Sequence, residues 1–277
     1  MLYKLRLFLA VLVLGAPLQL ISQNQIWGTV VSAENGGSIS YVNIGVAEKN
    51  IGTVSDEKGE FSFDIEQIAP SDSVIFSIVG YKRKAVTLRE LLANVSPQKI
   101  ELREHVIKLA EVVIEVDPSN SKVLGVQRVS GKKFGFVGGI GAGAEISRKM
   151  RISQPSVLNT ASIYVKNKKD QSFKLRLNVY TADPKEGSPG RSLLSQSIIL
   201  ESDLQEGWLS YDFKEPVVVD HAFYISYEWV ESNLQNPMIA LRGNNLDERV
   251  RVRPVSMGKW IMGGNYDFAI RCEVMND

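Results

Sequence analysis

The chain has 277 residues, of which 44% are hydrophobic and 23% are charged, and its formal net charge is +1. This balance is typical of a folded globular protein rather than a disordered one, and the length suits two domains of ordinary size. A net charge so close to zero gives no electrostatic basis for binding nucleic acid or an anionic membrane. We therefore expect no nucleic-acid partner.

Residues 1–23 have the pattern of a secretory signal peptide. Lys4 and Arg6 form a short basic region, and an unbroken apolar run follows from Leu7 to Leu14. The run is too short for a convincing membrane-spanning helix. The sequence predicts an exported protein that is no integral membrane protein after cleavage near residue 23, with an uncleaved anchor as the alternative.

The chain contains a single cysteine, Cys272, so an internal disulfide cannot form. Cys272 alternates with Ile270 and Val274 in a strand-like pattern. This spacing predicts a small buried apolar side chain in a terminal strand rather than a nucleophile.

Short apolar alternations separated by turns fill residues 24–104, which predicts a β-sandwich. One stretch, with Leu88, Leu91 and Leu92 at helical spacing, predicts one or two helical turns instead. The turn after residue 55 has a defined chemistry: Asp56 can accept hydrogen bonds from the following backbone, and Gly59 can take a positive φ. Strands are expected at residues 26–31, 41–46, 60–65, 74–78 and 100–102.

Three motifs in this segment, in this order, resemble one known family. They contain Gly28; then Gly52, Asp56, Gly59 and Phe61; then Gly80 and Tyr81. The segment resembles the carboxypeptidase-regulatory-like domain, a transthyretin-like sandwich of seven strands. The resemblance implies a non-catalytic accessory module, of the kind found beside metallocarboxypeptidases and at the N-terminus of TonB-dependent receptors of Gram-negative bacteria.

This resemblance sets the expected location. It implies the periplasm or the outer membrane of a Gram-negative bacterium. Residues 109–113 also resemble the segment that follows this domain in the receptors, but the remaining chain is too short for a receptor barrel. We therefore do not expect receptor function, and the family's name does not imply peptidase activity.

A connecting strand and linker are expected at residues 105–121, followed by a second domain at 122–277. The second domain has strand patterns throughout; in residues 172–180, for example, Phe173 and Leu175 face one way while Lys174 and Arg176 face the other. A loop is expected at 183–190, and strands at 193–200, 208–213, 222–229, 238–242 and 267–274. The fold class is thus all-β, with a second antiparallel sandwich that resembles the jelly-roll regions of exported bacterial proteins.

Catalytic residues are scarce. His105 and His221 are the only histidines, and neither lies in a zinc-binding motif. Zinc hydrolases need at least three ligands, so we expect no metal, no cofactor and no enzyme activity. A glycosidase is the minor alternative, and it would require two close carboxylates in a cleft of the second domain.

Aromatic residues gather in the second domain, where they could stack on sugar rings or fill the core. Trp208 has the opposite strand parity to Leu209 and Tyr211, which favours exposure, and Trp260 and Tyr266 lie among glycines. Arg249, Arg251 and Arg253 alternate along one strand face. They could bind a carboxylated glycan or another acidic partner, or form a solvated edge that discourages strand addition.

Together these patterns predict a non-catalytic, exported cell-envelope protein. In the preferred hypothesis its second sandwich is a binding module for a ligand such as a glycan, with Trp208, Trp260, Tyr266 and the three arginines as candidate ligand-binding residues. In the alternative hypothesis it is a structural or adaptor subunit of an outer-membrane or periplasmic complex, which docks on a partner protein through its sheet edges.

Overall fold

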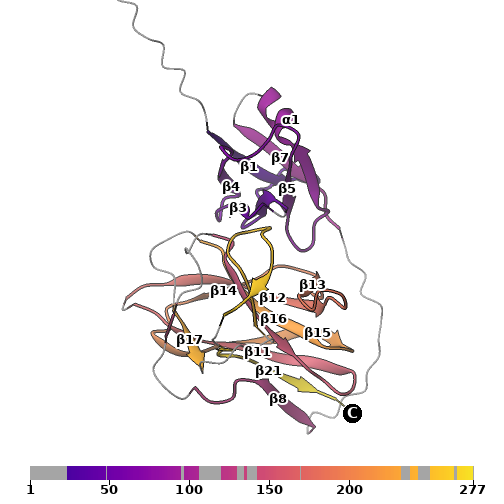
Figure 1. The fold of residues 1–277 in the computed structure, drawn as a ribbon, viewed down its shortest axis with the longest axis vertical. Coiled ribbons are helices and arrows are strands. Elements are labelled where there is room, and N and C mark those ends of the chain that lie inside the picture. Colours follow the sequence, from indigo (N-terminus) through magenta and orange to yellow (C-terminus); the bar gives the residue numbers. More distant parts are fainter. Residues whose placement is uncertain are drawn as a thin grey trace, which may run out of the picture.

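Two β-sandwiches, a small one above a larger one, make up the structure (Figure 1). The computed structural model describes residues 24–47, 49–94, 97–105, 120–129, 134–135, 142–168, 170–231, 238–242, 250–264 and 267–276. The expected signal peptide, and most of the expected linker, lie outside these residues. Within them, no helix has the length and apolar character needed to cross a membrane.

In the described residues the N-terminal sandwich has seven strands, as the family resemblance implies. Five of them match strands predicted from alternation, whereas β3 and β6 were not predicted. One sheet has the order β4-β1-β7 and the other has the order β3-β2-β5-β6. Strand β1 pairs antiparallel with β4 but parallel with β7. The strands are β1 (Gln25–Ser32), β2 (Asn43–Val46), β3 (Ile51–Val54), β4 (Glu60–Asp64), β5 (Ser73–Ser77), β6 (Lys84–Thr87) and β7 (Gln98–Leu102).

A single short helix, α1 (Leu88–Ala93), closes one end of this sandwich. Thr87 and Glu90 form a capping box at its start, which satisfies backbone donors that a helix cannot pair internally. Leu88 and Leu91 are buried as expected. The prediction that Leu92 shares their face is wrong: its side chain is 52% exposed, because a helix of six residues presents only one narrow stripe to the core.

The family motifs occupy strands and turns of the N-terminal sandwich. Asp56 Oδ1 accepts hydrogen bonds from the backbone N–H groups of Lys58 (2.9 Å) and Glu60 (2.8 Å), and Gly59 has φ +75°. This is the predicted turn chemistry. Phe61 is buried and packs edge to face on Phe76, with ring centroids 5.6 Å apart. The remaining motif residues lie in β1 (Gly28), in β3 (Gly52) and just after β5 (Gly80 and Tyr81).

The C-terminal sandwich consists of two sheets of seven strands whose pairings are all antiparallel. The upper sheet, which lies nearer the N-terminal sandwich (Figure 1), has the order β13-β12-β16-β10-β18-β19, with β14 also paired to β12. Its strands are β10 (Glu145–Met150), β12 (Phe173–Ala182), β13 (Pro189–Ser192), β14 (Ile198–Ser202), β16 (Phe223–Trp229), β18 (Val250–Arg253) and β19 (Ile261–Met262).

The lower sheet lies on the far side of the C-terminal sandwich (Figure 1). It has the order β20-β17-β11-β21-β8, with β15 paired to β11 and β9 paired to β17. Its strands are β8 (Ser121–Gly125), β9 (Phe134–Gly135), β11 (Ser156–Lys166), β15 (Glu206–Val219), β17 (Met238–Arg242), β20 (Asp267–Phe268) and β21 (Ile270–Met275).

Alternating apolar residues of the two sheets meet between them, as the sequence predicts. Leu175, Leu177 and Trp229 of the upper sheet pack in one buried cluster with Ile163 of the lower sheet. Cys272 belongs to the same cluster and is 1% exposed, so its predicted role as a buried apolar side chain is confirmed.

Several boundaries differ from the prediction, and two of the differences have a local cause. A strand, β13, begins at Pro189 inside the expected loop, because Tyr180 and Ala182 of β12 pair with it across an irregular register. The strand expected from Leu193 begins only at Ile198, since the Leu194 N–H donates to the Ser192 hydroxyl (3.1 Å) and turns the chain.

Candidate binding site

The upper sheet carries a row of four charged residues on its outer face, which we call the charged row: Arg176, Glu228, Glu145 and Arg253. Each residue is the direct cross-strand neighbour of the next, on β12, β16, β10 and β18. Arg176 Nη1 donates to Glu228 Oε2 (2.9 Å), and Arg253 pairs with Glu145 Oε2. Both carboxylates are fully buried, which is rare for ionisable groups that lack partners.

Glu145 is saturated with donors. Its Oε1 accepts hydrogen bonds from Asn178 Nδ2 (2.9 Å), the Tyr180 hydroxyl (3.1 Å) and the Ser226 hydroxyl (2.6 Å), in addition to the Arg253 ion pair on Oε2. Burying a charge is costly unless it is paired and hydrogen-bonded. The outer face of this sheet is therefore built to hold a buried carboxylate.

The N-terminal sandwich covers the charged row. Arg176 donates to Asn43 Oδ1 (3.0 Å) and to the Tyr41 carbonyl oxygen. Next to it, Lys174 Nζ donates to the Tyr41 hydroxyl (3.1 Å) and to Glu57 Oε2 (2.9 Å). The two sandwiches are thus joined by charge-assisted hydrogen bonds. The bond from Arg176 to Tyr41 is buried, whereas the bond from Lys174 to Glu57 is exposed.

Burial and charge shift the pKa values in this joint. Desolvation raises the pKa of Glu228, although Arg176 acts in the opposite direction. Burial alone would lower the pKa of Arg253, but the Glu145 carboxylate overcomes this and raises it. Hydrogen bonds to Tyr41 and Glu57 raise the pKa of Lys174. The two basic groups are therefore held firmly in their charged forms.

This geometry corrects the interpretation of Arg249, Arg251 and Arg253, which the sequence predicts to bind an acidic partner or to form a solvated edge. Arg251 and Arg253 do share a strand face, but Arg253 forms an internal ion pair and its side chain is only 12% exposed. Strand β18 is not an edge either, because β19 pairs with it. Arg251 is half-buried, and its Nη1 donates to the Val250 carbonyl (3.0 Å). Arg249 and Tyr266 lie outside the described residues.

Trp260 lies beside this joint rather than on a separate platform. Its half-buried ring stacks under the Arg253 guanidinium, 4.8 Å from the ring centroid, and meets Tyr180 edge to face at 6.2 Å. These contacts give Trp260 a packing role at the edge of the charged row.

Trp208 lies on the opposite side of the C-terminal sandwich, on the outer face of the lower sheet, as its parity predicts. We call this surface the Trp208 face; its residues used below are Ser162, Tyr164, Trp208, Ser210, Asp212 and Arg271. Trp208 is half-buried and is the cross-strand neighbour of Tyr164, with ring centroids 5.5 Å apart and planes at 88°. Trp208 and Trp260 therefore cannot act on one ligand surface.

Polar groups continue the Trp208 face along the strands. The hydroxyls of Ser162 and Ser210 lie 2.9 Å apart, and Thr160 Oγ1 donates to Asp212 Oδ1 (3.0 Å). Ser210 and Asp212 are exposed. An aromatic group next to exposed hydroxyl and carboxylate groups is a suitable surface for a sugar, which offers C–H groups on its faces and hydroxyls on its rim.

Two residues of this surface, and a third that borders it, were not predicted from the sequence. Tyr164 and Arg271 have outward parity on β11 and β21, so strand alternation could have predicted their exposure. Phe134 lies on the two-residue strand β9, which is too short to show such a pattern. Phe134 lies 6.4 Å from Tyr164 between ring centroids, and the Arg271 guanidinium lies 4.0 Å from the Trp208 centroid. Trp27, in β1, was also overlooked, although it is 47% exposed.

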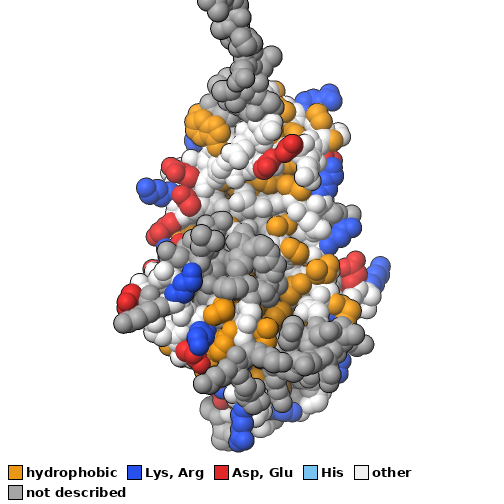
Figure 2. Space-filling view, turned by 60° about the vertical axis from the view of Figure 1, so that its left-hand side comes forward, with side chains coloured by type: hydrophobic (Ala, Val, Ile, Leu, Met, Phe, Trp, Pro, Cys, Tyr) orange, Lys and Arg blue, Asp and Glu red, His pale blue; other side chains and the backbone are white. Residues whose placement is uncertain are grey.

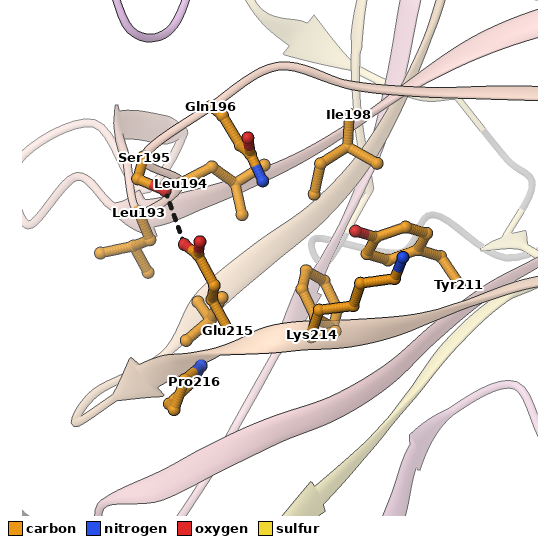
Figure 3. Close-up of a pocket in the computed structure, with 11 residues that line it drawn as sticks. Leu193, Leu194, Ser195, Gln196, Ile198, Tyr211, Lys214, Glu215 and Pro216 are labelled. Atoms are coloured by element: carbon orange, nitrogen blue, oxygen red, sulfur yellow. Dashed lines mark hydrogen bonds between the residues drawn. The ribbon is translucent and has the colours of Figure 1, made fainter. Parts of the chain in front are cut away.

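A pocket between β14 and β15 is shown in Figure 3. Ile198 and Tyr211 lie at one end, and the Ser195 hydroxyl donates to Glu215 (3.2 Å) at the other. Its cavity of about 30 Å³ has room for about one water molecule and none for a sugar ring. Elsewhere in the described chain, no group of three or more His, Cys, Asp or Glu side chains is placed to hold a metal ion.

The charges visible on the molecular surface are mixed. In Figure 2, basic and acidic side chains are interspersed rather than gathered into a patch of one sign.

The comparison with known families agrees with the fold and the motifs. The strands define an all-β protein of two sandwiches. Residues 26–114 match the family model of the CarboxypepD_reg-like domain. The N-terminal sandwich is thus a carboxypeptidase-regulatory-like domain, as its motifs indicate. No curated protein sequence matches the chain.

Proposed function

We propose that this protein is an exported, non-catalytic binding protein of the cell envelope, and that it binds glycans through the Trp208 face. One observation carries the proposal: Trp208 is half-buried on a sheet face that points away from the N-terminal sandwich, next to the exposed Ser210 and Asp212. The charged row of the upper sheet offers no comparable surface, because the N-terminal sandwich covers it. Export is proposed from the signal-peptide pattern of residues 1–23.

We propose a non-catalytic role because the carboxylates of Glu145 and Glu228 are buried and ion-paired. Glu145 and Glu228 are cross-strand neighbours, yet both are fully buried and ion-paired. A glycosidase needs carboxyl groups that reach the scissile bond from either side of a substrate. These two groups have no such access, and the histidines are exposed on separate elements.

The test is retention of the chain from residue 24 to the end on a panel of polysaccharides, by affinity electrophoresis and a glycan array. The whole chain is used because the two sandwiches share buried contacts. We expect retention by the native protein and its loss in Trp208→Ala. Trp260→Ala is the matched control, since it removes the same ring from the opposite face, and it should be retained normally.

Trp208 also packs against a small buried cluster with Ala240 and Ala269, so Trp208→Ala requires a fold check by circular dichroism. Ser210→Ala provides a second probe: it removes an exposed hydroxyl, together with its hydrogen bond to the buried Ser162 hydroxyl. We expect it to weaken retention while the protein stays folded, as circular dichroism would show. Equal retention of all variants, or no retention of the native protein, would exclude the Trp208 face as a glycan site.

The adaptor hypothesis has its own supporting observation. Strand β19 ends the upper sheet, and its Ile261 and Met262 side chains are 50% and 48% exposed. An exposed apolar edge strand is a template for pairing with a strand of another protein. Co-purification of a stoichiometric envelope protein that is lost in an Ile261→Lys variant would favour this hypothesis over glycan binding.

A further inference from the structure

The Trp208 face contains a basic group that forms no ion pair with any carboxylate of the described residues. Among the described residues, the one contact of the Arg271 guanidinium is the Trp208 ring, 4.0 Å from its centroid; no carboxylate of that part of the chain lies within ion-pairing distance. Arg271 is half-buried. Its five N–H donors are therefore held at the surface without an anionic acceptor.

The acids nearest to Arg271 on this face have other partners. Asp212 accepts a hydrogen bond from Thr160 (3.0 Å), and Glu206 pairs with Lys166 (3.1 Å). Glu273 lies two residues further along β21, which is about 7 Å in strand geometry, and it accepts from Asn159 Nδ2 (2.9 Å). These bonds hold the carboxylates in place and away from the guanidinium.

Trp208 has a definite role in this arrangement. A guanidinium over an indole ring is attracted to the negative face of the ring, so its position is fixed while its edge stays available for hydrogen bonds. The same contact covers one side of the indole. Trp208 is thus a positioning residue for Arg271 as well as a surface for a sugar ring.

We propose that the glycans bound by the Trp208 face are acidic, and that Arg271 is the residue that binds their oxyanion groups, either uronate carboxylates or sulfate esters. The planar fork of arginine matches two oxygens of such a group with two parallel hydrogen bonds. The exposed Ser210 hydroxyl, which lies 2.9 Å from the buried Ser162 hydroxyl, then bonds to the sugar hydroxyls. This inference rests on the proposed glycan-binding function and gives the chemical class of its ligand.

The experiment uses the chain from residue 24 and two matched pairs of polymers: polygalacturonate against its methyl ester, and dextran sulfate against dextran. Within each pair the backbone is the same and only the oxyanion differs. We expect the native protein to bind at least one charged polymer about tenfold or more tightly than its neutral partner, since a hydrogen bond to a charged group is worth more than a neutral one. The two pairs separate the carboxylate source from the sulfate source.

Arg271→Met should abolish this preference without changing the melting temperature. Arg251→Met is the control, because it removes the same charge from a half-buried arginine on the opposite sheet; it should keep the preference. Arg271→Lys should restore it only partly, since a lysine retains the charge but lacks the fork.

The outcomes separate the inference from the function on which it rests. Equal binding of charged and neutral polymers that is lost in Trp208→Ala would overturn the role of Arg271 and leave glycan binding intact. The same holds if Arg271→Met and Arg251→Met reduce the preference equally, because the effect would then be one of net charge. If the native protein binds no polymer, either on the glycan array or in affinity electrophoresis, both the role of Arg271 and the proposed glycan-binding function would be overturned.

Discussion

The carbonyl oxygen of Ser256, in the C-terminal sandwich, occupies the space next to Gly52, in the N-terminal sandwich, that any side chain at position 52 would need. Gly45 is also close, though less so than Gly52: a Cβ there would lie 2.9 Å from the same oxygen. Beside them, the Lys259 N–H donates to Asn50 Oδ1 (2.9 Å). A glycine of the family motif thus lies at the junction between the two sandwiches.

Gly52→Ala should therefore weaken the joint between the sandwiches. The added Cβ overlaps backbone rather than a flexible side chain, so we expect a loss of about 1–3 kcal/mol, the usual cost of overpacking. Calorimetry should show one unfolding transition for the native chain and two for the variant. Gly37→Ala, in an exposed turn where the nearest atom is the end of the Asn35 side chain, is the control. An unchanged single transition in Gly52→Ala would contradict this account.

Arg176→Met should destabilise the protein strongly, because it leaves Glu228 buried without its counter-charge. Breaking a buried pair in this way costs about 3–5 kcal/mol, and chemical denaturation would measure it. The double variant Arg176→Met with Glu228→Met should recover much of this loss, since no charge then remains unpaired. A double variant that is less stable than Arg176→Met would show that the charged row contributes net stability.

The raised pKa of Glu228 predicts the sign of a pH dependence. Burial makes the folded carboxyl bind its proton more tightly than the unfolded one, whose pKa is near 4.5. The contribution of Glu228 to the free energy of unfolding should therefore fall as the pH rises above 4.5. Stability curves of the native protein and Glu228→Gln, recorded from pH 4 upward, give this contribution as their difference. A difference that rises with pH would mean that attraction to Arg176 outweighs burial.

Cys272 should be unreactive in the folded protein. Burial raises the pKa of its thiol well above the ordinary value near 9, and the thiolate is the reactive form. An aromatic disulfide reagent should therefore label the chain only after denaturant is added. Because the folded thiol keeps its proton longer than the unfolded one, stability should also fall as the pH rises above 9, and this fall should be absent in Cys272→Val. Rapid labelling without denaturant would indicate that β21 opens locally.

Patterning along the chain was enough to establish the local structure. Alternation places Phe61 and Phe63 in one core and Leu175 and Leu177 in the other, because a strand turns successive side chains to opposite faces. Asp56 and Gly59 define their turn by chemistry that involves only near neighbours in sequence. The same parity rule put Trp208 on an outer face.

Only the tertiary structure decided what each outer face meets. Arg253 and Trp208 have similar sequence signals, yet the first is paired with a buried Glu145 108 residues away and the second lies on the far side of the sandwich. Arg176 finds its acceptors 133 and 135 residues earlier, in a different sandwich. Strand periodicity specifies which way a side chain points, but its partner depends on how sheets stack. For that reason the joint at Gly52 and the contact of Arg271 with Trp208 became visible only in the folded chain.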